Sequence, residues 1–265
     1  MRFYPREDGL FESKLEIPDG NNPDQNAWLT LTIRYRLNFV DDWNEKAGIT
    51  VERENGGFLA LDGDKTALPI VSWDLASKTE FGNVFQRGEK IWNQRFVLIT
   101  PQDYDGLDYE SLPWKVRPNV LCLFRLVPAA SPHLEIDVVR LDPSVDSHQF
   151  RSTPNLYDNG DVYRPTLGHE LGHALGLDEI MVMKGDKRCV ANSRAGRCYG
   201  ETEEERANIM GSGRNITLIC ARPWLDSIAD YTGRAKGDWT ATLDAKTPPR
   251  KIPIGVSLVG EPARW

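Results

Sequence analysis

The chain has 265 residues, a formal net charge of −7, 40% hydrophobic residues and 27% charged residues. This length could form one large domain or two small ones around a buried core, and the composition is ordinary for a soluble globular protein. The acidic balance argues against phosphate binding as the main activity, so we expect no nucleic-acid partner. No apolar run approaches membrane-spanning length, so we expect no membrane partner.

The N-terminus and the cysteines leave the compartment open. Residues 1–8 lack the apolar core of a signal peptide, which fits a missing leader, a cytosolic protein or leaderless export. Cys189 and Cys198 enclose a short loop that a disulfide could close, although two reduced thiols fit equally well. Cys122 and Cys220 lie in apolar runs typical of core thiols. Because there is no Cys-x-x-Cys pair, we do not expect a zinc ribbon.

The first part of the chain predicts an irregular lead-in followed by strands and one helix. Residues 1–27 are rich in Pro, Gly, Asn and Asp, which favours irregular structure. Strict apolar–polar alternation from Trp28 to Val40 predicts a long half-buried strand. Turn-forming sequences at 55–57 and 62–64 predict short strands on either side. The apolar spacing from Phe81 to Trp92 predicts a helix that backs the sheet.

Three apolar runs then predict further strands of the same sheet: Arg95–Thr100, Asn119–Val127 and Leu134–Leu141. The stretch Tyr157–Asp161 is most simply a turn, because it contains Asp, Asn and Gly. A calcium site that uses Asp158 and Asp161 is an alternative interpretation of the same stretch.

The most informative stretch is Thr-Leu-Gly-His-Glu-Leu-Gly-His-Ala-Leu-Gly-Leu-Asp-Glu. His169 and His173 are four residues apart, which on a helix places both imidazoles on one face, close enough to share a metal ion. Glu170 follows the first histidine, where it can take a proton from a water at the metal. A plain structural helix is the alternative. We favour the metal site because a glycine and a carboxylate continue the pattern.

The two ends of this helix are also marked in the sequence. Pro165 suits a first helical turn, where its missing N–H would have no partner. Gly176 can adopt the positive φ that ends a helix. The chain then presents Asp178 and Glu179 directly after the helix.

This stretch resembles the metzincin clan of zinc metallopeptidases, whose pattern is His-Glu-x-x-His-x-x-Gly-x-x-His, and it looks most like the matrixin branch. Where the family has its third histidine ligand, this chain has Glu179, and no histidine follows His173. The resemblance implies Zn²⁺ held by His169, His173 and Glu179, since two His and one Glu form a known catalytic zinc set. The alternatives for the third ligand are Asp178 and a carboxylate of Glu201–Glu205.

The segment after the zinc motif also resembles the family. Thr202 and Glu205 have the spacing of a capping box, which predicts a helix start. Residues 207–213, Ala-Asn-Ile-Met-Gly-Ser-Gly, resemble the Met-turn of metzincins, a tight turn with a methionine beneath the zinc site. We assign this methionine to Met210. Met183 is the alternative, because matrixins reach their Met-turn sooner.

The C-terminal part predicts one helix and two strands. Pro223–Tyr231 has an amphipathic pattern, and Gly233 marks the end of the helix. Short strands are predicted at Trp239–Leu243 and Ile254–Val259.

The resemblance covers about residues 28–233 and implies an α+β, zincin-like fold. Such a fold has a twisted mixed β-sheet, backing and active-site helices, and a smaller C-terminal subdomain. We therefore expect residues 1–265 to form a single metallopeptidase domain, with an upper subdomain at 1–177 and a lower one at 178–265.

The function that we expect is that of a zinc-dependent endopeptidase, a monomer with a protein or peptide substrate, in which Glu170 is the general base. A further oxyanion donor is implied by the resemblance, and Tyr231 and Arg214 are candidates. One alternative is a zinc amidase or carboxypeptidase that acts on cell-wall peptides. Another is a catalytically weak metzincin-like protein that binds a partner, although the intact Glu170 argues against it.

Overall fold

A computed structural model describes the chain in segments, and the structural statements below concern these residues: 2–5, 11–17, 26–40, 51–54, 57–61, 67–70, 72–108, 117–140, 155–158, 163–180, 200, 202–211 and 213–243. The chain divides into two compact units. Unit 1 comprises Met1–Thr32, Lys90–Arg125 and Leu175–Trp265, and unit 2 comprises Ile33–Glu89 and Leu126–Ala174. The subdomains expected from the sequence stay a prediction.

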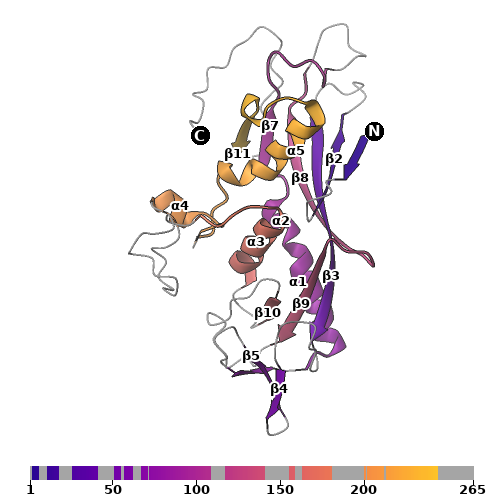
Figure 1. Cartoon of the computed structure of the whole chain (residues 1–265), viewed down its shortest axis with the longest axis vertical. Coiled ribbons are helices and arrows are strands. Elements are labelled where there is room, and N and C mark those ends of the chain that lie inside the picture. Colours follow the sequence, from indigo (N-terminus) through magenta and orange to yellow (C-terminus); the bar gives the residue numbers. More distant parts are fainter. Residues whose placement is uncertain are drawn as a thin grey trace. The chain divides into compact units, whose positions relative to one another are not determined.

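Unit 1 is built on a sheet with the strand order β1-β2-β3-β8-β7-β11 (Figure 1). Its strands are β1 (Arg2–Pro5), β2 (Glu12–Glu16), β3 (Ala27–Val40), β7 (Phe96–Ile99), β8 (Val120–Pro128) and β11 (Thr240–Leu243), of which β3 and β8 continue into unit 2. Four of the neighbouring pairs are antiparallel: β1–β2, β2–β3, β7–β8 and β7–β11. The strands predicted around residues 28–40, 95–100, 119–127 and 239–243 are therefore confirmed.

The irregular lead-in predicted for residues 1–27 is wrong at Arg2–Pro5 and at Glu12–Glu16, which are strands. Strands β1 and β2 pair with each other, and β2 pairs along β3, with Leu15 opposite Leu29. The local composition favours turns, but β3 offers a row of backbone donors and acceptors that the N-terminal segment satisfies. The partner lies later in the chain, so the local pattern did not reveal the pairing.

The core of unit 1 lies between this sheet and α5 (Arg222–Thr232). Trp224 is fully buried, and its indole N–H donates to the Leu123 carbonyl oxygen at 3.0 Å. Its ring lies against that of Phe96, with centroids 5.5 Å apart. Gly233 ends the helix with φ 67°, as the sequence predicts. The remaining helical segments that belong wholly or mainly to unit 1 are α2 (Glu89–Trp92), α4 (Glu203–Ala207), η4 (Leu218–Ala221) and η5 (Lys236–Asp238).

In unit 2, the continuation of β3 pairs in parallel with β9 (Leu134–Arg140), and β9 pairs in parallel with β10 (Asn155–Asp158). The turn predicted at Tyr157–Asp161 is wrong for its first two residues, because Tyr157 and Asp158 pair with Val139 and Arg140. A second, antiparallel sheet has the order β4-β5-β6, with β4 (Val51–Glu54), β5 (Gly57–Leu61) and β6 (Ala67–Ile70). This sheet confirms the short strands predicted beside residues 55–57 and 62–64.

Helix α1 (Leu75–Arg87) covers β3 in unit 2. The buried ring of Phe85 lies 4.6 Å from that of Tyr35, centroid to centroid. The helix begins six residues before the predicted Phe81, because the carboxylate of Asp74 caps it by accepting the Ser77 N–H at 2.7 Å. It ends at Arg87 with Gly88 as its C-cap, and the short helix α2 then reaches the predicted end at Trp92.

The expectation of an α+β chain with a mixed sheet is confirmed, since the larger sheet contains both parallel and antiparallel pairs.

None of the helices in the described residues has the length and apolarity needed to cross a bilayer. Cys122 and Cys220 are buried free thiols, as predicted, and burial raises the pKa of both. The predicted Cys189–Cys198 bridge and the strand at 254–259 lie outside the described residues.

Candidate metal centre

Helix α3 (Tyr163–Ala174) carries the His-Glu-x-x-His sequence, and Pro165 lies in its first turn, as predicted. Leu167 and Leu171 are buried on one side of the helix. A methyl group added to Gly88 would lie only 2.9 Å from Leu167 Cδ2 and 2.8 Å from Leu171 Cδ1. Close packing against this glycine therefore holds α3 in place within unit 2. Because the side of the helix with Leu167 and Leu171 is buried there, the rotation of the helix about its axis is also fixed.

The two motif histidines meet on this helix. Their Nε2 atoms are 3.1 Å apart. Their rings are nearly perpendicular, with an interplanar angle of 88° and centroids 4.7 Å apart. Both side chains are partly exposed. The predicted i, i+4 placement of His169 and His173 on one helix face is thus confirmed.

A third ligand atom lies near this pair. Gly176 has φ 83° and ends the helix as the sequence predicts. The chain that follows brings a carboxylate oxygen of Glu179 into a group with His169 and His173, in which all ligand atoms lie within 4.8 Å of one another. Within the described residues, this is the group of His, Cys, Asp and Glu side chains that could hold a metal ion.

The donor set and its spacing fit zinc. Two ligands at Zn–N distances of about 2.0–2.1 Å in a tetrahedral site lie roughly 3.3 Å apart. The Nε2 atoms of His169 and His173, at 3.1 Å, are close to that value. Imidazole and carboxylate are common zinc ligands, and three protein ligands leave a fourth position open for water or substrate. Three described side chains therefore have the types and spacing of zinc ligands.

Glu170 lies beside the histidines on the same helix. It precedes His173 by three residues, a spacing that makes the two side chains neighbours on the helix surface. Its Oε2 atom is shielded from solvent. Low local polarity strengthens the interaction of such an oxygen with a proton donor.

The segment that carries Glu179 is fixed from two directions. The guanidinium of Arg222, at the start of α5, donates to the Gly176 carbonyl oxygen and, at 2.9 Å, to Oδ2 of Asp178. On the other side of Glu179, the Ile180 N–H donates to the Met210 carbonyl oxygen at 2.9 Å. Sequence reasoning missed Arg222, because nothing local connects it with residues 44 and 46 positions earlier.

The segment around Met210 forms a tight, hydrogen-bonded turn. Met210 is 1% exposed, and its N–H donates to Oδ1 of Asn208 at 2.7 Å. The side-chain amide of Asn208 donates in turn to the Thr217 hydroxyl at 2.6 Å. The backbone also bridges Asn208 and Asn215. Asn208 is a second residue that sequence reasoning missed, and its signal would have been a buried polar side chain next to a methionine.

The carboxylates that could replace Glu179 as third ligand are engaged or placed differently. Asp178 pairs with Arg222. The predicted capping box is confirmed, with the Glu205 carboxylate accepting the Thr202 N–H at 3.0 Å, while Glu203 and Glu204 are exposed. Glu201 lies outside the described residues, as do Met183 and the predicted calcium ligand Asp161.

The two candidate oxyanion donors have separate surroundings within unit 1. The Tyr231 hydroxyl donates to the Ser13 carbonyl oxygen of β2 at 2.6 Å, which ties α5 to the sheet. Arg214 is exposed, and its backbone N–H donates to the Ala207 carbonyl oxygen. The oxyanion role stays a prediction for both residues.

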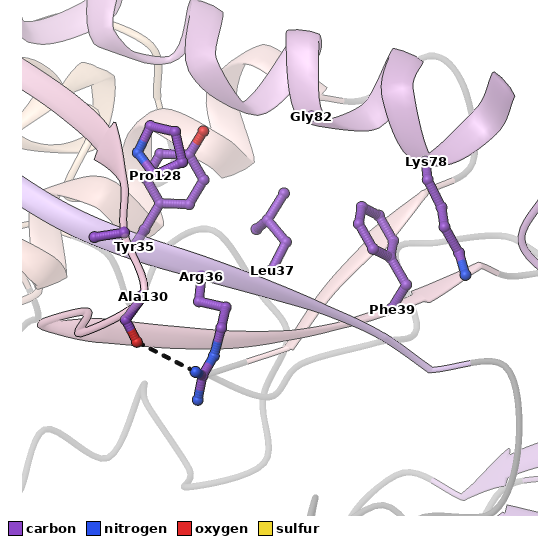
Figure 2. A pocket seen from close by; sticks show the side chains of 9 residues that line it. Tyr35, Arg36, Leu37, Phe39, Lys78, Gly82, Pro128 and Ala130 are labelled. Carbon is purple, nitrogen blue, oxygen red and sulfur yellow. Dashed lines mark hydrogen bonds between the residues drawn. The ribbon is translucent and has the colours of Figure 1, made fainter. Parts of the chain in front are cut away.

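Unit 2 also contains an open groove of about 470 Å³ between β3 and α1. Its walls include Tyr35, Leu37 and Phe39 of β3, and Lys78 and Gly82 of α1. Figure 2 shows Leu37 and Phe39 pointing from the strand towards the helix, whereas Arg36 points away and donates to the Ala130 carbonyl oxygen. The lining is mainly apolar and includes no carboxylate or imidazole among the described residues.

A scan against protein families, a search of curated proteins and a search of solved structures find no match for this chain.

Proposed function

We propose that this protein is a zinc-dependent endopeptidase with a metzincin-like fold. The observation that carries the proposal is the convergence of the His169 and His173 Nε2 atoms at 3.1 Å, with a Glu179 oxygen in the same group. His169, His173 and Glu179 would hold the metal, and the substrate would be a protein or peptide. Two neutral imidazoles and one carboxylate reduce the charge of a bound dication by one unit.

The chain's own residues supply the proton transfers. When bound, zinc acts as a Lewis acid that lowers the pKa of a water and polarises the scissile carbonyl. Glu170 accepts the proton of the attacking water and then delivers it to the leaving amine. Its place on α3, three residues before His173, keeps it next to the ligands through both transfers.

The order of structural elements supports the metzincin-like fold. Most strands of the mixed sheet precede α3, with β11 following it, and a glycine with positive φ ends that helix. A tight turn with the buried Met210 and the helix α5 follow. Metzincins have the same succession of sheet, active-site helix, Met-turn and C-terminal helix, so we propose Met210 as the methionine of the Met-turn.

Metal analysis and a protease assay on matched variants test this function. Native mass spectrometry should show about one zinc per chain, and casein should be cleaved until a chelator is added. Glu170→Gln should keep zinc but lose at least ~100-fold in rate, because the amide cannot accept the proton. His169→Ala should lose both zinc and activity.

Each arm of the assay has a result that would contradict the proposal. A metal-free protein after zinc repletion would contradict the metal site. Full activity in Glu170→Gln would contradict the role of Glu170 as general base. Zinc binding without casein cleavage would leave two functions, a cell-wall amidase or carboxypeptidase and a binding protein. An assay with purified peptidoglycan separates them, because only the first of these would cleave peptidoglycan.

A further inference from the structure

Asp178 and Glu179 are adjacent carboxylates with the same chemistry towards a metal ion, yet they have different partners. Asp178 accepts a hydrogen bond from Arg222 Nη1 at 2.9 Å. Glu179 belongs to the group of possible metal ligands, and Asp178 does not. Asp178 is thus engaged by Arg222, while Glu179 is the carboxylate in the group of possible ligands.

Arg222 is itself well placed to hold this segment. It begins α5, and the next residues, Pro223 and Trp224, are buried. The Trp224 indole is hydrogen bonded to β8 through the Leu123 carbonyl oxygen. The backbone of Arg222 is therefore anchored to the core of unit 1, so its guanidinium provides a fixed point for the Gly176 carbonyl oxygen and for Asp178.

The exposure of the ion pair argues against a role mainly in folding stability. The side chains of Arg222 and Asp178 are 40% and 84% exposed. An ion pair this exposed contributes little to the free energy of unfolding, because water screens its charges. The consequence of the contact is therefore local: it orients the backbone on the N-terminal side of Glu179, as the Ile180–Met210 hydrogen bond does on the C-terminal side.

We propose that Arg222 is a positioning residue that makes Glu179, and not Asp178, the carboxylate ligand of the metal. This inference rests on the proposed zinc site. The guanidinium holds Asp178 towards α5 and holds Gly176 at the turn. The backbone of the intervening residues then presents the Glu179 side chain to the histidines without a large loss of conformational freedom on metal binding.

The test compares the zinc affinity of apo variants, measured by competition with a chromogenic chelator. Arg222→Met keeps the aliphatic stem but loses the charge and all donors, and we expect about tenfold weaker zinc binding, the lower end of the range for residues that support a ligand. Arg222→Lys should recover part of this loss, because one ammonium restores the charge beside Asp178 but not both contacts. The urea midpoint of the apo protein should stay unchanged.

Arg234→Met is the matched control. Arg234 pairs with Asp103 and with Asp238, and its side chain and that of Asp103 are 31% and 71% exposed, similar to the pair under test. The control removes ion pairs of the same kind and should leave zinc affinity at the wild-type value. An equal loss in both variants would mean that general charge, and not position, explains the effect, and it would overturn the inference.

A double-mutant cycle tests whether Arg222 acts through Glu179. Glu179→Ala should weaken zinc binding, and adding Arg222→Met to it should have no further effect. Wild-type affinity in Arg222→Met beside weakened binding in Glu179→Ala would overturn this inference alone, as would an undiminished effect of Arg222→Met in the Glu179→Ala background. Absence of zinc binding by the wild-type protein would overturn the proposed function together with the inference.

Discussion

Replacing Gly213 with alanine should disrupt the turn around Met210. A Cβ atom at this position would lie 2.0 Å from the carbonyl oxygen of Ala207 and 2.1 Å from its carbonyl carbon. These distances are far inside van der Waals contact, which begins at about 3.5 Å between carbon atoms. The atoms that would be met belong to the backbone, so no side-chain rotation can relieve the overlap.

The cost follows from the hydrogen bonds that the turn would have to stretch. Three of them join the same two short segments: Gly213 N–H to the Asn208 carbonyl oxygen at 3.1 Å, and the N–H groups of Arg214 and Asn215 to the Ala207 carbonyl oxygen at 3.0 and 2.8 Å. At about 1 kcal/mol each, their loss lowers the free energy of unfolding by about 3 kcal/mol. For a chain of this size, this corresponds to a thermal midpoint roughly 6–12 °C lower.

Urea unfolding of the apo protein measures this effect against two glycine controls. An added Cβ meets nothing within 4 Å at Gly237 or at Gly82. Gly237→Ala should be nearly neutral, and Gly82→Ala, inside α1, should stabilise the protein by about 0.5–1 kcal/mol through helix propensity and the unfolded state. A wild-type midpoint for Gly213→Ala would refute the steric reasoning and the tight turn on which it rests.

Three further changes test other parts of the structure. Leu171→Ala should cost about 2–5 kcal/mol of stability by urea unfolding, because the side chain is 2% exposed and packs against Gly88, and a midpoint equal to wild type would show that α3 is not fixed by this contact. Tyr231→Phe should cost about 1 kcal/mol through its lost bond to Ser13, with casein cleavage within a few-fold of wild type. A fall of 100-fold or more would instead make Tyr231 the oxyanion donor. Burial raises the pKa of the Cys122 thiol well above 9.0, so the folded state favours the neutral thiol. The buried neutral thiol therefore contributes its full stability below pH 9, and this contribution to the free energy of unfolding is lost as the pH rises further. The stability of wild type relative to Cys122→Ala should therefore fall as the pH rises above 9, and a difference that does not change with pH would contradict the burial of a neutral thiol.

The features that could be predicted from the sequence are those whose cause is local. Alternation along Trp28–Val40 predicted β3, because burial on one face repeats every two residues. The spacing of His169 and His173 predicted their convergence for the same kind of reason, since a helix brings residues four apart together. The positive φ of Gly176 follows from the residue type itself.

The features that were missed depend on partners elsewhere in the chain. Strand β2 forms because β3 offers it hydrogen bonds, and β10 forms because β9 does. Both strands are short and lie among turn-forming residues, so pairing overrides the local preference. Helix α1 begins early for a different reason: Asp74 is a good N-cap, a local signal that the apolar spacing alone did not include.

The same division runs through the candidate metal centre. The two histidines are placed by one helix, whereas the segment with Glu179 is held by Arg222 and by the carbonyl of Met210. A helix fixes its ligands as long as it is folded, but a loop ligand is only as well placed as the contacts around it. Changes at Arg222 or in the Met210 turn should therefore alter how tightly the metal is held while leaving the histidine pair intact. Loss of either histidine would remove the proposed site itself, whereas changes at these supporting residues would adjust only how well Glu179 is held.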